Sequence, residues 1–303
     1  MDMTDIHAAI ARVPLFDGRE VKAFRINGGI TNINWRVVDQ SSRETFFVKL
    51  HGPGTEQFID RQTALAAAKI AAQKGVGPQV LFHDDDAGIE VHEFLQGFTS
   101  CDIVDAQDER VRANIMAAYK DMHDSLLLER ENTGLSQFED FVGKVVGKSP
   151  MVPRDIDQLV WQARRAKAAI EASGITLAGC YNDAYISNYM RNDDAEIRII
   201  DWEYAANNDP YWDVAMFSFE VFFDDIRGIS SILEMYEGAV REDVLARTYL
   251  YIGVAMVRWG LWAIYQSMTS PIGFDFAKYS RLLLLRARRQ IGSPEWDWAL
   301  TKV

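Results

Sequence analysis

The sequence predicts an α+β protein, with a small strand-rich region followed by a larger, mainly helical one. Segments rich in β-branched and aromatic residues gather before residue 96 and have the composition of strands, at residues 21–26, 33–38, 45–50 and 89–95. After residue 106, apolar residues recur instead at helical spacing, over residues 108–128 and 155–172. We therefore expect a small antiparallel sheet within residues 1–96 and mainly helices within residues 97–303.

The remaining elements follow from local signals along the chain. Residues 4–12 have the pattern of a short amphipathic helix, and residues 58–74 that of a longer helix ending at Gly75, a typical C-cap. Residues 79–83 follow a Gly-Pro turn, and residues 197–200 form a short β-branched run typical of a strand. Residues 138–148 fit either a loop or a short helix. The strand that ends before Gly97 marks the expected boundary between the two regions.

Composition and charge limit the classes of function. The chain has 303 residues and a net charge of −12, which disfavours nucleic acid and anionic membranes as partners and is compatible with a small cationic substrate. Only Cys101 and Cys180 are present and the N-terminus lacks a signal-peptide core, so we expect a reducing, cytoplasmic location. Residues 248–265 are long and apolar but contain Arg258, which predicts a buried core helix rather than a membrane span.

Three polar residues in the second half of the chain have the spacing of a phosphoryl-transfer site. Asp183 and Asn188 are five residues apart in a loop-like segment, and Asp201 follows the strand at residues 197–200. Such a site needs one carboxylate facing the attacking hydroxyl and an Asn–Asp pair holding Mg²⁺ against the phosphates. A turn whose Asp and Asn cap local backbone is the alternative interpretation.

Two features of the N-terminal region fit the same chemistry. The loop Asn27-Gly28-Gly29-Ile30-Thr31-Asn32 would let backbone N–H groups approach a phosphate, although a hairpin turn has the same composition. Lys49 lies on the third predicted strand, where it would pair with phosphates or lie on a solvated face.

These motifs together resemble the choline/ethanolamine kinase family. The resemblance rests on Asn182-Asp183 with Asn188, on IDWEYA at residues 200–205, on Asp213-Val-Ala and Phe219-Glu220, and on the WGLW motif at residues 259–262. It covers about residues 27–289 and implies a two-lobe protein-kinase-like fold with ATP and Mg²⁺ as cofactors. A protein kinase is disfavoured, because HRD and DFG are absent and the tryptophan-containing helix would have no role.

The resemblance assigns a role to each candidate residue. It implies catalysis by Asp183, Asn188 and Asp201, the last two as Mg²⁺ ligands, and structural bracing of the catalytic loop by Asp213. It implies nucleotide binding by Gly29, Thr31, Asn32, Lys49, Glu93 and Leu95. It implies a pocket for a substrate amine, walled by Glu220, Trp259, Trp262 and Tyr279; the two tryptophans share a helix face and would otherwise be core residues. Glu203 and Tyr204 fit either a catalytic or a structural role.

The sequence departs from the family at two positions. The helix at residues 58–74 has Arg61 but carries Ala64 where relatives have a glutamate that holds the lysine. Either another acid, such as Glu56, reaches Lys49, or the lysine is held less firmly. Tyr181 stands where relatives have histidine, and we expect the tyrosine to support the same loop.

The expected activity is ATP-dependent phosphorylation of the hydroxyl of a small amino alcohol, choline first and ethanolamine second. Thiamine or an aminoglycoside is the nearest alternative acceptor, and a catalytically silent amine-binding protein is the alternative from another class. No stable membrane insertion is expected. The oligomeric state stays open, with a homodimer as one alternative.

Overall fold

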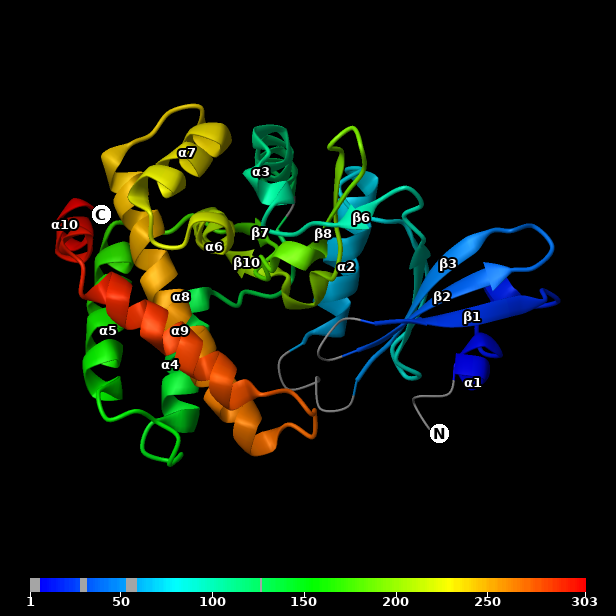
Figure 1. Ribbon diagram of the computed structural model, residues 1–303, viewed down its shortest axis with the longest axis horizontal. Coiled ribbons are helices and arrows are strands. Elements are labelled where there is room, and N and C mark those ends of the chain that lie inside the picture. The colour runs from blue at the N-terminus through cyan, green and yellow to red at the C-terminus, as the bar shows by residue number, and fades with distance from the viewer. Residues whose placement is uncertain (1–5, 28–31, 53–58, 126) are drawn as a thin grey trace.

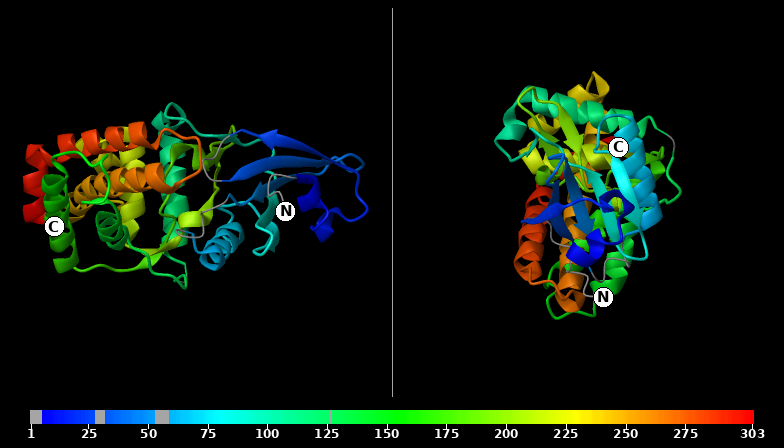
Figure 2. Two further views of the ribbon diagram at one scale, coloured as in Figure 1. Left: turned by 90° about the horizontal axis from the view of Figure 1, so that it is seen from below. Right: turned by 90° about the vertical axis from the view of Figure 1, so that its right-hand side faces the viewer.

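The computed structural model describes residues 6–27, 32–52, 59–125 and 127–303. The molecule is elongated, with a sheet at one end and a larger helical region at the other (Figure 1). Seen from below, the same division holds, and the C-terminus lies at the end farthest from the sheet (Figure 2). The expected α+β class with an antiparallel sheet first and helices afterwards is confirmed.

Five of the described strands form one antiparallel sheet at the N-terminal end. Its order is β1-β2-β3-β5-β4, with the bounds β1 Val21–Ile26, β2 Ile33–Asp39, β3 Thr45–Leu50, β4 Val80–Asp84 and β5 Ile89–Glu93. On the central strand β3, Phe46, Val48 and Leu50 pack in a core with α1 (Ile6–Ile10). Because strand side chains alternate, Phe47 and Lys49 face the opposite side, toward the rest of the protein.

Helix α2 (Arg61–Gln73) follows β3 and precedes β4 in the chain, and it lies between the sheet and the helical region (Figure 1). It begins later than residue 58 because Asp60 acts as N-cap, its side chain accepting the N–H of Thr63 at 2.9 Å. Its end agrees with the prediction, since Gly75 has the left-handed φ of +72° that suits glycine after a helix. The helix contacts the turn Trp202–Tyr204, which follows Asp201.

The centre of the helical region is α8 (Glu242–Thr269), whose middle is almost wholly buried. The helices packed around it or near it are α3 Glu109–His123, α4 Gly134–Val145, α5 Ile156–Ala172, α6 Pro210–Phe222, α7 Ile226–Glu237, α9 Phe276–Ile291 and α10 Pro294–Lys302. The expectation of a buried core helix at residues 248–265 is confirmed. Within the part of the chain that the structure describes, no helix has the length and apolarity needed to cross a bilayer.

Two short sheets hold the segments between these helices. β7 (Ala178–Cys180) pairs with β10 (Ala206–Asn208), and β8 (Tyr189–Arg191) lies between β6 (Thr99–Ser100) and β9 (Ile197–Ile199). The loop after β7 and the turn after β9 therefore come to the same end of the helical region, next to α2.

The prediction of one helix over residues 108–128 is wrong at its C-terminal end. Helix α3 ends at His123, because the chain is then held by a side chain from a distant strand. Asn207 accepts the N–H of Leu128 at 2.8 Å and donates to its carbonyl at 2.7 Å. Residues 138–148, left open between loop and helix, lie largely in α4. The division of the chain at residues 96–97 falls between β5 and β6 and stays a proposal.

Candidate active site

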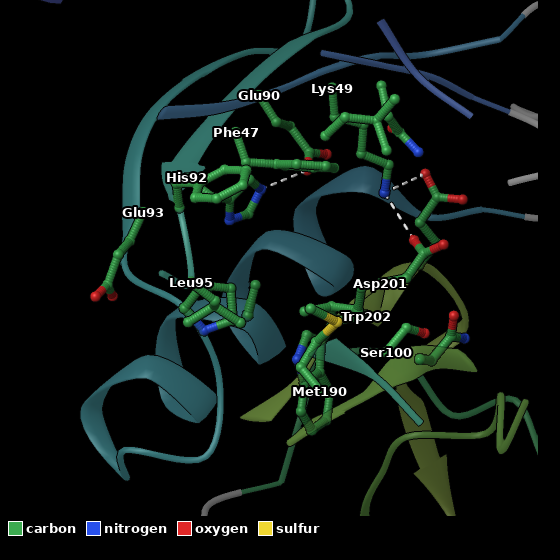
Figure 3. A pocket seen from close by; sticks show the side chains of 18 of the residues that line it. Phe47, Lys49, Glu90, His92, Glu93, Leu95, Ser100, Met190, Asp201 and Trp202 are labelled. Atoms are coloured by element: carbon green, nitrogen blue, oxygen red, sulfur yellow. Dashed lines mark hydrogen bonds and ion pairs between the residues drawn. The ribbon is translucent and has the colours of Figure 1, made fainter. Parts of the chain in front are cut away.

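A cavity of about 410 Å³ lies where the sheet meets the helical region. Strands β3 and β5, helix α2 and the β8–β9 hairpin all contribute to its walls. Five of the predicted site residues line it together, namely Lys49, Glu93, Leu95, Asn188 and Asp201. Figure 3 shows the charged groups of Lys49 and Asp201 at one side of the cavity and Glu93 and Leu95 at the other.

Most of the remaining wall is apolar. Phe47, Leu95, Met190 and Trp202 surround the space with aromatic or aliphatic side chains (Figure 3). The backbone N–H of Glu93 donates to Gln79 O at 2.9 Å, so this donor is used within the strand region. A largely apolar cavity with the Lys49 ammonium at one side suits a ligand that has an aromatic ring and an anionic group.

Of the other predicted nucleotide contacts, Asn32 is the one that the structure describes. Gly29 and Thr31 lie outside the described residues, as does Glu56. Asn32 is buried beside the cavity, where its Nδ2 donates to Glu203 Oε1 at 2.9 Å and its Oδ1 accepts the N–H of Gly52 at 3.2 Å. The structure therefore gives Asn32 a position close to the charged side of the site.

Lys49 is held by two carboxylates rather than by an acid on α2. Its Nζ lies 2.7 Å from Asp201 Oδ1, a contact drawn in Figure 3, and 2.9 Å from Glu203 Oε1. Burial alone would lower the pKa of Lys49, but Asp201 and Glu203 raise it above its ordinary value. Of the alternatives for Ala64, the one in which another acid reaches the lysine is confirmed, and that acid is Glu203. The suggestion that Glu56 supplies it is not needed.

Glu203 organises this charged group, and the sequence left its role open. Its Oε1 also accepts a hydrogen bond from Arg61 Nη1 at 2.7 Å, so two cations and an amide converge on one carboxylate. Lys49 and Arg61 keep the pKa of Glu203 below its ordinary value, although burial acts in the opposite direction. The left-handed backbone of Asp201, with φ of +64°, directs the chain so that Asp201 and Glu203 both reach Lys49.

The loop that carries Asp183 and Asn188 is fixed by several hydrogen bonds. Asp213 on α6 accepts the backbone N–H groups of Tyr181 and Asn182, each at 2.7 Å. Asn188 Nδ2 donates to Asp183 Oδ2 at 3.2 Å, which places the two predicted catalytic side chains in contact. This geometry is the brace that the resemblance implied for Asp213.

Tyr181 supports the same loop in the manner expected. Its side chain is fully buried against Trp202, with ring centroids 4.9 Å apart, and its hydroxyl donates to Ile200 O at 2.7 Å. Because Ile200 precedes Asp201, this hydrogen bond ties the Asp183 loop to the Asp201 turn. The tyrosine therefore provides the packing and hydrogen bonding required at this position.

A buried histidine that sequence reasoning missed completes the brace. His123 at the end of α3 contacts Asp213 Oδ2 through Nε2 at 3.0 Å and the Tyr236 hydroxyl through Nδ1 at 2.8 Å. His123, Asp213 and Cys180 together have the composition of a small metal site. Both nitrogens of His123 and both oxygens of Asp213 already have partners within the protein, so a structural role explains the cluster.

Asp183 and Glu220 are buried carboxylates whose pKa values are raised. Burial, with the charges of Asp201 and Glu203, raises the pKa of Asp183 to about 7, while Arg258 acts in the opposite direction. Burial likewise raises the pKa of Glu220 to about 7, opposed by Arg286. A carboxylate with a pKa near neutrality is suited to accept a proton at physiological pH.

Trp259, Trp262 and Tyr279, three of the four predicted substrate residues, form one aromatic cluster with Tyr204. Trp259 packs edge-to-face on Tyr204 at 5.7 Å and on Trp262 at 5.3 Å, and Trp262 packs on Tyr279 at 6.5 Å. Tyr204 lies three residues after Asp201. The pKa of Tyr279 is raised by burial and then by Glu220 and Asp183, which indicates that both acids lie near its hydroxyl. The indoles are therefore close to the catalytic loop.

The residues present suit a divalent cation of the hard type. Asp201 and Asn188 line one side of the same cavity, and carboxylate and amide oxygens are ligands that Mg²⁺ prefers. These two residues would hold such an ion next to the end of Lys49.

The fold and the site define a class of protein: a protein-kinase-like phosphotransferase. The sheet carries Lys49, a lysine placed to pair with phosphates, and faces the helical region. That region carries Asp183 and Asn188 on one loop and Asp201 on a turn. The family model described as choline/ethanolamine kinase matches residues 23–228. The chain belongs to this family, whose members are phosphotransferases that act on an alcohol group.

Curated relatives carry both activity names. The chain is 21% identical to probable choline kinase 2 of Arabidopsis thaliana, over 88% of this chain and 85% of the relative. It is 23% identical to ethanolamine kinase 2 of Rattus norvegicus, over 88% of this chain and 75% of the relative.

Solved structures share the fold over nearly the whole chain. A choline/ethanolamine kinase family protein from Mesorhizobium loti has a TM-score of 0.86 at 25% identity, covering 99% of this chain and 98% of that one. Choline kinase LicA of Streptococcus pneumoniae in complex with AMP has a TM-score of 0.77 at 20% identity, covering 94% and 97%.

Proposed function

We propose that this protein is an ATP-dependent kinase that phosphorylates the hydroxyl of a small amino alcohol, choline or ethanolamine. One observation carries the proposal: Asp183 contacts Asn188, which lines the cavity described above (the nucleotide-type cavity), and interacts electrostatically with Tyr279 of the aromatic cluster. Lys49, Asn188 and Asp201 line the cavity, while Asp183 acts electrostatically on both Asp201 and Tyr279. A phosphate donor and an amine acceptor would therefore meet at Asp183.

In the proposed reaction each residue acts on a stated group. The apolar part of the cavity holds the base of ATP, and the Lys49 ammonium contacts the phosphates. Asp183 orients the acceptor hydroxyl and takes its proton as the oxygen bonds to the γ-phosphorus and the bond to ADP breaks. Asn188 and Asp201 would hold Mg²⁺, which would supply neutralisation of the phosphate charge. Placement and charge neutralisation supply most of the rate.

The amine would lie among Glu220, Trp259, Trp262 and Tyr279. A carboxylate and electron-rich ring faces both stabilise a cationic nitrogen. The same pocket would accept thiamine, which is also a cation with a primary alcohol, whereas an aminoglycoside requires several acids for its several ammonium groups.

LicA in complex with AMP supports the assignment of the cavity to an adenine nucleotide. Cys101 and Cys180 are both free thiols, which supports a cytoplasmic location.

The test is ADP release coupled to a reporter, with choline, ethanolamine, thiamine and kanamycin as acceptors, each with and without Mg²⁺. We expect Mg²⁺-dependent turnover with choline or ethanolamine. Asp183→Asn should abolish it while leaving the melting temperature within a few degrees of wild type. Turnover with thiamine or kanamycin alone would refute the amino-alcohol assignment. No turnover with any acceptor, together with choline binding, would favour a catalytically silent amine-binding protein.

A further inference from the structure

A buried arginine within the aromatic cluster has no role in the reaction described so far. Arg258 on α8 is 3% exposed, and its guanidinium carbon lies 3.5 Å from the centre of the Trp259 ring and 5.3 Å from that of Phe141. One nitrogen, Nη2, donates to Gln137 Oε1. The guanidinium is therefore stacked on the indole that the proposed function assigns to the substrate.

Two nitrogens of Arg258 lack an acceptor among the residues that the structure describes. Among the described residues, neither Nε nor Nη1 of Arg258 has a hydrogen-bond partner, and no carboxylate forms an ion pair with it. The indole N–H of Trp262, also buried, lacks an acceptor within the same described part of the chain. Guanidinium nitrogens can only donate, so these groups together require an oxygen acceptor.

This arrangement is costly unless a ligand completes it. A buried donor without an acceptor loses its hydration with no compensation, and a buried charge loses more. The cost is visible in the pKa of Arg258, which burial lowers to about 10. An apolar side chain of similar size would fill the space at lower cost. The unused donors therefore indicate a binding role rather than a contribution to stability.

The position of Arg258 assigns that role to the acceptor side of the site. Its electrostatic neighbours are Tyr204, Asp183 and Tyr279, followed by Asp140 on α4, and it is not among the residues that line the nucleotide-type cavity. One face of Trp259 is covered by the guanidinium and cannot hold a substrate ammonium. A substrate amine would instead pair with Glu220, near Tyr279.

We propose that Arg258 determines specificity by binding a second oxygen function of the acceptor, so that the preferred substrate is a hydroxylated amine bearing a carboxylate or a further hydroxyl beside the nitrogen. This proposal rests on the proposed kinase function and narrows its substrate class. The amine would pair with Glu220 while the added oxygen accepts from Arg258 Nε and Nη1. Choline and ethanolamine lack that oxygen and would be weaker acceptors.

Three matched acceptors test the proposal, because they differ only in the group on one carbon. Ethanolamine has no added oxygen, serinol adds a hydroxymethyl group, and L-serine adds a carboxylate. We expect kcat/KM for serinol or L-serine to exceed that for ethanolamine by at least about tenfold, or about 1.4 kcal/mol. The better of the two identifies the oxygen source.

Arg258→Met should remove this preference without loss of the fold. The ratio of kcat/KM for serinol or L-serine to kcat/KM for ethanolamine should fall by about tenfold or more, while ethanolamine turnover is retained. The melting temperature should stay equal or rise, because an unsatisfied buried charge is removed. The matched control is Arg165→Met, which removes a guanidinium 5.0 Å from the exposed ring of Trp161 and should change neither ratio nor turnover.

Each other outcome overturns one specific claim. An unchanged ratio in Arg258→Met refutes the specificity role while the kinase function stands. An equal loss with all three acceptors in a folded variant also refutes it and assigns Arg258 to the phosphoryl group. If wild type turns over no acceptor, the proposed function fails. Thermal shifts by serinol, L-serine and ethanolamine in wild type and Arg258→Met then decide the binding role, since a ligand of the native state raises its melting temperature. Equal shifts in the two proteins refute it.

Discussion

Replacing Glu203 by glutamine tests the charge arrangement that holds Lys49. The substitution keeps the size of the side chain and one acceptor oxygen but removes the negative charge. Lys49 Nζ and Arg61 Nη1, at 2.9 and 2.7 Å from Glu203 Oε1, would then face a neutral amide. Asp201, 2.7 Å from Lys49, would be the carboxylate left to balance the lysine.

The expected cost follows from burial. Glu203 is 5% exposed and Lys49 is 6% exposed, so the pair is screened little by water. Removing one partner of a buried ion pair costs about 3–5 kcal/mol. Because Asp201 still pairs with Lys49, we expect the lower end, about 3 kcal/mol, in the free energy of unfolding. The matched control is Glu139→Gln, which breaks an exposed pair with Arg164 and should cost at most about 1 kcal/mol.

Function should change along with stability. Without Glu203, Lys49 would pair more strongly with Asp201. The lysine would then compete with Mg²⁺ for the Asp201 carboxylate. We expect the Mg²⁺ concentration for half-maximal activity to rise by about tenfold, corresponding to about 1.4 kcal/mol. Urea denaturation and Mg²⁺ titration of ADP release measure the two effects. A Glu203→Gln protein with wild-type stability and wild-type Mg²⁺ dependence would show that the acid does not hold the lysine.

A second substitution examines the site at which relatives carry their glutamate. Ala64 is buried, lines the cavity and lies one helical turn after Arg61. Introducing Ala64→Glu into the Glu203→Gln protein should recover part of the lost stability and of the Mg²⁺ affinity. Ala64→Glu in the wild-type background should instead destabilise, because a third acid is then buried beside Asp201 and Glu203. Destabilisation of both proteins to the same degree would contradict an exchange of roles between the two positions.

Three further predictions concern the catalytic loop and the amine site. Asp201→Asn should lower turnover by at least about a hundredfold, as measured by ADP release. The fold should stay intact, because asparagine tolerates the left-handed backbone and Glu203 still holds Lys49; circular dichroism checks this. Glu220, with its pKa raised to about 7 by burial, should be neutral below that pH and charged above it. The KM for the amine should therefore fall as pH rises through 7, and Glu220→Gln should remove this dependence; an identical pH profile in the variant would exclude Glu220 as the partner of the amine. Tyr181→Phe loses the hydrogen bond to Ile200 O and should cost about 1–2 kcal/mol of stability and lower kcat more than it raises KM, as measured by thermal denaturation and steady-state kinetics.

Local patterns in the sequence were sufficient for most of the sheet. Residues 45–50 alternate as a strand should, and the structure has β3 at those bounds. The C-terminal end of α3 was missed, because the bonds that Asn207 makes to Leu128 come from a residue 79 positions away. Helical spacing contains no information about such a partner, so tertiary hydrogen bonds decided the boundary.

The site shows the same division between local and distant information. Spacing placed Asp183, Asn188 and Asp201 near one another, since a short loop and a short strand leave little freedom between them. Glu203 as the partner of Lys49 could not be read in this way, because the pair is 154 positions apart in sequence and forms through the backbone turn at Asp201. A non-glycine residue with positive φ leaves only a weak signal in sequence. From the sequence, Arg258 favours a buried core helix over a membrane span. Its donors without an acceptor among the described residues appear only once the neighbours are placed.

The two acids beside Lys49 need not be equivalent in the proposed reaction. Asp201 lines the cavity with a side chain about one-third exposed, whereas the Glu203 side chain is almost wholly covered and also binds Arg61 and Asn32. An ion that binds Asp201 would withdraw that carboxylate from the lysine. Glu203 would then keep the ammonium in place, so that the lysine faces the phosphates instead of following Asp201. The buried acid therefore sets the position of Lys49 and the more exposed acid serves the metal. This is why substitution of Asp201 should lower turnover by at least about a hundredfold, whereas substitution of Glu203 should weaken both Mg²⁺ affinity and stability.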